Sequence, residues 1–98
     1  MEIIKEKNGE QLKFALVGRL DTTTAPDLEN AVKEDLNGVT DFVLDFEKLE
    51  YISSAGLRVL LAAQKVMNVQ GKMVVKNANE DIKEVFDITG FADILTVE

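Results

Sequence analysis

The stretch Phe42-Val43-Leu44-Asp45-Phe46, followed by Tyr51-Ile52-Ser53-Ser54-Ala55-Gly56-Leu57-Arg58, decides how this chain folds. The first run is apolar and typical of a strand, whereas the residues from Leu57 to Met67 form an apolar run typical of a helix. Two hydroxyl side chains therefore lie where a strand ends and a helix begins. A helix start offers free backbone N–H groups and favours negative charge, so it would accommodate an added phosphate. We interpret Ser54 as a candidate switch residue.

The composition limits the classes of protein to which the chain can belong. The sequence has 98 residues, 46% of them hydrophobic, which predicts a single domain spanning residues 1–98 with a real core. It contains no histidine and no cysteine. Their absence removes the usual general base, the Ser-His-Asp arrangement and the commonest ligands of zinc and iron–sulfur centres. We therefore predict a protein that is not an enzyme, with no catalytic residues, no metal site and no cofactor.

The net charge of −7 restricts the possible partners. An acidic surface repels phosphate backbones and anionic membrane surfaces, so we expect no nucleic-acid binding and no membrane insertion. No apolar run is long enough to span a bilayer, and residues 1–7 alternate charged and apolar side chains without a signal-peptide core. These features predict a soluble, cytoplasmic protein.

The first half of the chain has the pattern of a hairpin followed by a helix. Strands are predicted near 2–7 and over 11–20, because the turn signal Asn8-Gly9 separates them. A polar loop then leads into a helix that is expected to begin at Thr24 or Ala25 and to end near Asn37-Gly38. Thr24 and Asp27 have the spacing of a capping box.

The second half alternates strands and helices. The run 41–46 is apolar enough to predict a central strand that is buried on both faces, and residues 48–52 are expected to carry the chain over the sheet edge. A helix is predicted over about 54–69. After it we expect a strand at 72–76, a helix at 80–89 capped by Asn79, and a short last strand at 94–97.

The resulting order β-β-α-β-α-β-α-β predicts an α/β fold, a mixed β-sheet of about five strands with α-helical crossovers. In such sheets, ligands and partners meet the loops at the carboxyl ends of the parallel strands. Three loops are expected to gather at that edge: 21–24, 50–56 and 77–79. We expect the functional site there.

Several short motifs, in their order and spacing, resemble the STAS domain family, and within it the single-domain bacterial anti-sigma factor antagonists. The resemblance covers nearly the whole chain. The motifs that carry it are Gly18-Arg19-Leu20-Asp21 with Ala25 and Leu28, Val43-Leu44-Asp45-Phe46 with Leu49, Tyr51-Ile52-Ser53-Ser54-Ala55-Gly56-Leu57, Gly71-Lys72-Met73-Val74-Val75 and Phe86-Asp87-Ile88-Thr89-Gly90-Phe91.

The resemblance implies a phosphorylation switch. The family's signature loop typically reads Asp-Ser-x-Gly-Leu, and its serine is phosphorylated by a partner kinase that is itself the anti-sigma factor. Aligning on Gly56-Leu57 places that serine on Ser54, with Ser53 as the second choice, and places Ser53 where the family has Asp. The unphosphorylated protein would bind the anti-sigma factor serine kinase, phosphorylation would switch it off, and a phosphatase would reverse the change.

The resemblance also implies which residues meet the kinase. Asp21 is expected to lie close to the serine and to contribute to kinase recognition. The full set of expected partner-binding residues is Asp21, Thr22, Thr23, Thr24, Ser53, Ser54, Ala55, Gly56, Leu57 and Arg58.

Other interpretations of the same residues remain open. Ser54 could be only a helix N-cap, Asp21 a turn former and Arg58 a solvated helix residue. The alternative function is a non-phosphorylated STAS scaffold subunit of a transporter, lipid-transfer or signalling complex, and Ser53 in place of Asp favours it. A small enzyme with Ser54 as its nucleophile and a nucleotide-binding protein are further alternatives, although the chain has neither His or Cys nor a Gly-rich phosphate loop.

Overall fold

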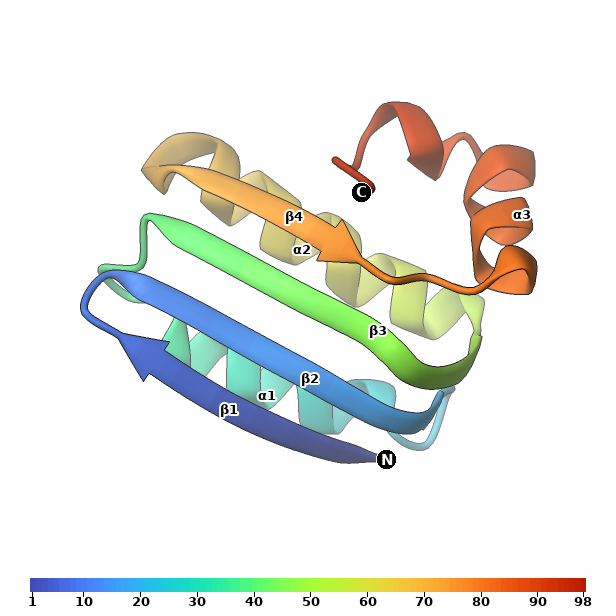
Figure 1. Ribbon diagram of the computed structural model, residues 1–98, viewed down its shortest axis with the longest axis horizontal. Coiled ribbons are helices and arrows are strands. Elements are labelled where there is room, and N and C mark those ends of the chain that lie inside the picture. The colour runs from blue at the N-terminus through green and yellow to red at the C-terminus, as the bar shows by residue number, and fades with distance from the viewer.

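The computed structural model describes all residues from 1 to 98 as a four-stranded sheet with helices against it (Figure 1). The strands are β1 (Glu2–Asn8), β2 (Gln11–Leu20), β3 (Asp41–Ile52) and β4 (Lys72–Lys76), in the spatial order β1-β2-β3-β4. The helices are α1 (Ala25–Asp35), α2 (Ser54–Gln70) and α3 (Glu80–Thr89), followed by a 3-10 turn at Phe91–Asp93. β1 is antiparallel to β2, and the other pairs are parallel. The predicted mixed α/β fold is confirmed.

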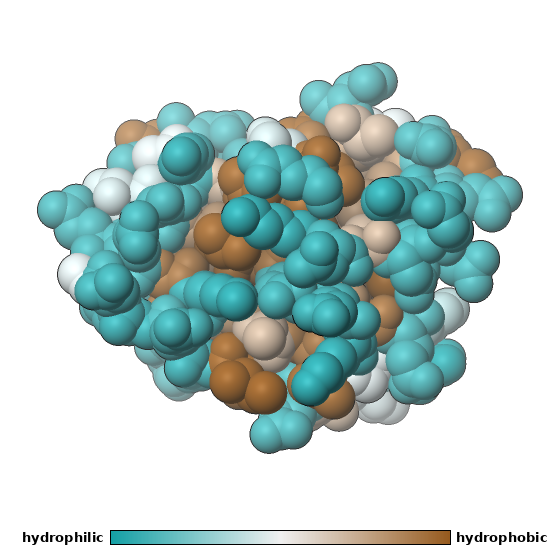
Figure 2. Space-filling view, in the orientation of Figure 1, coloured by the Kyte–Doolittle hydropathy of each residue, from teal (hydrophilic) through white to brown (hydrophobic).

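The core lies between the sheet and the two helices α1 and α2, which cover the same face of it (Figure 1). Alternate residues of the inner strands point into this layer because side chains along a strand alternate between its faces. The rings of Phe14 and Phe42 meet edge to face with their centroids 5.1 Å apart. The opposite face of the sheet shows apolar patches between polar side chains (Figure 2).

β3 is longer and less deeply buried than the sequence predicts. It continues to Ile52, so residues 48–52 pair with β2 instead of carrying the chain over the sheet edge. Phe42 and Leu44 are fully buried, whereas Val43 and Asp45 on the other face are only half-buried. The prediction of burial on both faces is wrong because α1 and α2 cover only one face.

The predicted last strand at 94–97 is also wrong. The chain forms a 3-10 turn after Gly90, and Val97 alone pairs with Val75 as an isolated bridge. Its two hydrogen bonds, from Val75 N to Thr96 O and from Glu98 N to Val75 O, are each 2.8 Å long. The sheet therefore has four strands, whereas the sequence predicts about five.

Three loops meet at the carboxyl ends of the parallel strands, as the sequence predicts. The backbone N–H of Ser53 donates to Leu20 O at 2.9 Å, which joins the ends of β3 and β2. The side chain of Asn79 donates to Leu49 O at 3.2 Å, which joins the loop before α3 to β3. We call this edge, formed by residues 21–24, 50–56 and 77–79, the rim. No helix in the chain has the length and apolar character needed to cross a membrane.

Candidate functional site

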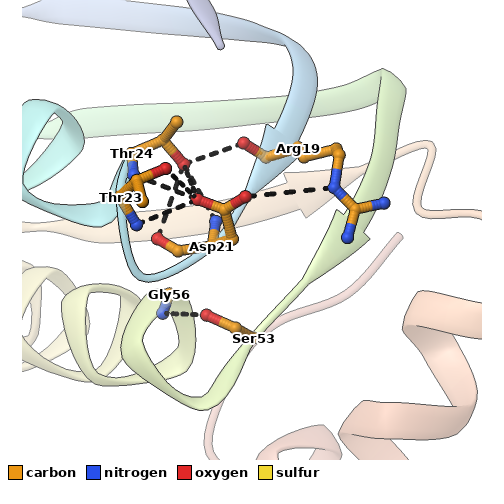
Figure 3. Close-up of polar contacts among 6 residues, drawn as sticks. All are labelled: Arg19, Asp21, Thr23, Thr24, Ser53 and Gly56. Atoms are coloured by element: carbon orange, nitrogen blue, oxygen red, sulfur yellow. Dashed lines mark hydrogen bonds and ion pairs between the residues drawn. The ribbon is translucent and has the colours of Figure 1, made fainter.

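The two serines at the start of α2 have different roles; Figure 3 draws the first of them, Ser53, beside Gly56. Ser53 is the N-cap: its backbone is extended (φ −99°, ψ 174°), and its Oγ accepts a hydrogen bond from Gly56 N at 3.4 Å. Ser54 is the first residue of the helix, is exposed, and makes no side-chain hydrogen bond within the chain. The interpretation of Ser54 as only an N-cap is therefore wrong, because Ser53 occupies that position and leaves the Ser54 hydroxyl free.

Gly56 brings the first turn of α2 close to the strand ends. A Cβ at this position would lie 2.7 Å from Leu20 Cγ and 2.9 Å from Ile52 Cγ1. Leu57, the next residue, is 5% exposed and belongs to the core. Gly56 and Leu57 thus pack the first turn of α2 against the strand ends, which holds Ser54 at the rim. Neither residue offers a side chain to a partner.

Asp21 closes the loop between β2 and α1 (Figure 3). Its Oδ1 accepts hydrogen bonds from Thr23 Oγ1 at 2.7 Å, Thr23 N at 3.0 Å and Thr24 N at 3.1 Å. The Thr23 hydroxyl bond is the main reason why the pKa of the Asp21 carboxyl is lowered from its ordinary value; partial desolvation opposes the shift, and the bonds from Thr24 add to it. Asp21 is therefore an anionic turn former.

The predicted capping box at the start of α1 does not form. Thr24 occupies the N-cap position, but its side chain makes no capping hydrogen bond. Its Oγ1 instead donates to Arg19 O at 2.8 Å and accepts from Asp21 N at 2.9 Å. The hydroxyl is engaged by the loop behind it and is not available to the helix.

Arg19 extends the rim through a contact with Tyr51 that the sequence did not predict. They are register partners on β2 and β3, and the guanidinium carbon of Arg19 lies 4.3 Å from the centroid of the Tyr51 ring. Arg19 Nε is 3.9 Å from Asp21 Oδ2 (Figure 3). A signal was available, since Arg19 and Asp21 are two positions apart where β2 ends, and side chains two positions apart along extended backbone lie on the same face.

The expected partner-binding residues divide by exposure. Those accessible to a partner are the exposed residues Thr22, Thr23, Ser54 and Arg58, and the half-buried residues Asp21, Thr24, Ser53 and Ala55. No three His, Cys, Asp or Glu side chains converge as metal ligands. The site is therefore a small polar surface with one free serine hydroxyl, two arginines and one anchored carboxylate.

Comparison with known proteins assigns the chain to a family. The model of the STAS domain matches residues 2–98. The chain belongs to the STAS domain family. Among its relatives, the Bordetella bronchiseptica protein BtrV, a candidate anti-sigma factor antagonist, is 37% identical over 99% of this STAS chain and 85% of its own length.

Solved structures show the same fold. The anti-sigma factor antagonist SpoIIAA in its unphosphorylated form superimposes on this STAS domain with a TM-score of 0.78, covering 99% of this chain and 87% of the other. The phosphorylated form of SpoIIAA from Bacillus gives 0.77, covering 99% and 91%. Both are 20% identical to this chain, so the likeness describes the fold.

Proposed function

We propose that this STAS domain is an anti-sigma factor antagonist. In its unphosphorylated form it binds an anti-sigma factor serine kinase through the rim, and phosphorylation of Ser54 by that kinase releases it. The observation that carries the proposal is the exposed Ser54 hydroxyl, which makes no hydrogen bond within the chain while its neighbour Ser53 caps the helix. The names of the relatives support the same function.

The serine at position 53 is compatible with this function. Asp and Ser are both strong N-caps, since each offers a short side-chain oxygen to the N–H groups of the first helical turn. Ser53 performs that role by accepting from Gly56 N. Replacing the family's aspartate by serine therefore preserves the local structure that presents Ser54, and this favours the switch over the non-phosphorylated scaffold.

The phosphoryl transfer needs no catalytic group from this chain. The kinase supplies ATP and a base: the bond between the γ-phosphorus and ADP breaks, a bond to Ser54 Oγ forms, and the hydroxyl proton passes to the base. The chain is the substrate of the reaction, in the cytoplasm where the kinase acts, and a phosphatase that hydrolyses the phosphoserine restores it.

Charge accounts for the release. A phosphoserine carries about −1.5 to −2 charges at neutral pH. It would join the anionic Asp21 on the surface of a protein whose net charge is already −7. A kinase surface that accepts the neutral hydroxyl would have to desolvate and oppose this added charge. A typical coupling of about 1–3 kcal/mol would weaken binding roughly 5- to 150-fold.

The test is a phosphopeptide map of the protein purified from its own host, with intact mass for stoichiometry. We expect one phosphate on Ser54, at a level that changes with growth condition. The Ser54→Ala variant should keep the kinase bound after ATP is added, whereas the wild type dissociates. A phosphate on Ser53 in Ser54→Ala cells would move the site to Ser53, and no phosphate under any condition would favour the constitutive scaffold.

A further inference from the structure

Arg58 lies one turn after Ser54 on α2. The two residues are four positions apart in one helix, which places them on the same face with their Cβ atoms about 5–6 Å apart. Both are exposed. Arg58 and Arg19 are the only arginines among the eleven cationic side chains of the sequence, and they lie next to the rim, Arg19 near the end of β2 and Arg58 near the start of α2. Ser54 therefore has a guanidinium group within reach of any group added to its hydroxyl.

Arg58 has no partner in the unphosphorylated protein. It takes part in no salt bridge and no hydrogen bond, whereas Arg19 is engaged by Asp21 and Tyr51. Arg58 lines a groove of about 190 Å³ between the first turns of α1 and α2. The carboxylate lining that groove, Glu29, lies 3.8 Å from Lys33 Nζ along its own helix. The positive charge of Arg58 is thus uncommitted.

We propose that Arg58 is the intramolecular partner of the phosphate on Ser54 and a positioning residue for the switch; this inference rests on the proposed function. An acidic group four residues before a basic one is the favourable order on a helix. The guanidinium fork of arginine also matches two phosphate oxygens at once. Because helix side chains tilt toward the N-terminus, the long side chain of Arg58 reaches along α2 and pairs with the phosphate on Ser54.

The pairing gives phosphorylation two effects on the binding of the kinase. In the unphosphorylated protein Arg58 is free to meet an acidic side chain of the kinase. In the phosphorylated protein the same guanidinium is neutralised from within, and the local charge of this helix face changes from +1 to about −1. Phosphorylation thus neutralises a cation that the kinase would contact, and it adds an anion that the kinase surface would repel.

The test uses the whole protein with phosphoserine encoded at position 54, so it requires no kinase. Titration of the phosphate by 31P NMR should give a second pKa below the usual value of about 6. Arg58→Gln should raise that pKa by roughly 0.3 unit or more, and 1 M salt should remove most of the difference. Arg58→Lys should keep part of the effect.

Lys65→Gln is the matched control, because Lys65 is an exposed cation on the same helix, about three turns from Ser54 and about two turns beyond Arg58. It should leave the phosphate pKa unchanged. Identical titrations of the wild type and Arg58→Gln would overturn the pairing and leave the proposed function intact. A host protein without phosphate on Ser54 would defeat the proposed function, whatever the encoded phosphoserine shows.

Discussion

At the scale of single residues, short polar side chains fix the two loops that flank the site. Asp21 gathers three donors from Thr23 and Thr24, and Ser53 accepts from Gly56 N. The sequence predicts polar loops at both places, but it could not tell which of two adjacent serines is the cap because both are good N-caps. The extended backbone at Ser53 decides it.

Exchanging the two serines for alanine should separate their roles. Ser53→Ala is expected to lower the free energy of unfolding by about 0.5–1 kcal/mol, at the low end of cap losses because the hydrogen bond is 3.4 Å long. Ser54→Ala should change it by less than about 0.5 kcal/mol. Urea unfolding measures both. Ser53→Asp is the control that should keep a cap at this position. Equal losses of unfolding free energy in Ser53→Ala and Ser54→Ala would contradict the assignment.

The Asp21 loop should open in acid. The pKa of Asp21 is depressed, so its hydrogen bonds stabilise the fold above the unfolded value near 3.8 and are lost as the pH falls through the lower folded pKa. Carbon-13 NMR of the carboxyl group measures this titration. Thr23→Val should raise the pKa toward 3.8 because it removes the hydroxyl donor. Thr22→Val, at a residue without a bond to Asp21, should leave it unchanged.

At the scale of elements, the sequence predicts the bounds of a helix or strand well where turn or cap residues lie at its ends. The predicted bounds of β2, β4 and α3 agree with the structure because turn and cap residues mark their ends. The second half of β3 gives no such signal, since Glu47 and Lys48 are both exposed and interrupt the alternation. Pairing with β2, through shifts of register, keeps that half extended. A long-range pairing of this kind is not visible in the sequence nearby.

Gly56→Ala tests the close contact of α2 with the strand ends. Alanine favours a helix interior over glycine by about 1 kcal/mol, which alone would stabilise the protein. A Cβ 2.7 Å from Leu20 Cγ is expected to outweigh that gain, so that the variant loses about 1–3 kcal/mol of unfolding free energy. Ala62→Gly, at an exposed position of the same helix, measures the propensity alone. A more stable Gly56→Ala variant would show that the packing is loose.

At the scale of the whole molecule, Asp45 connects the open face of the sheet to the rim. Its Oδ1 accepts from Asn77 Nδ2 at 3.1 Å and from Glu47 N at 3.0 Å, and its Oδ2 lies 3.6 Å from Lys13 Nζ. Asn77 has a positive φ of 62° in the loop before α3. Asp45 thus joins β2, β3 and that loop, which accounts for a charged residue in a central strand.

Stability should depend on the charge of Asp45. Burial alone would raise the pKa of this carboxyl, but the bonds from Asn77 and Glu47 and the charge of Lys13 outweigh it and lower the pKa. Asp45→Asn is therefore expected to unfold more easily at pH 7, by about 1 kcal/mol or more. The gap from wild type should close as the pH falls below 3.8 through the folded pKa, because the wild-type carboxyl then becomes neutral.

Thermal unfolding from pH 7 to pH 2 measures this gap. Asp87→Asn is the control, since Asp87 is exposed and has no ion pair. A gap between Asp45→Asn and the wild type that is constant with pH would show that the variant perturbs packing and not charge.

The antiparallel pairing of β1 with β2 decides where a reporter can be attached. β1 starts beside the end of β2, so Met1 lies near Gly18 on the rim side of the sheet (Figure 1). A fluorophore or surface tether placed before Met1 would crowd the kinase. The Asn8-Gly9 turn lies at the opposite end of β2, about 30 Å away for ten residues of strand. Immobilisation through that turn leaves Ser54 open to solution.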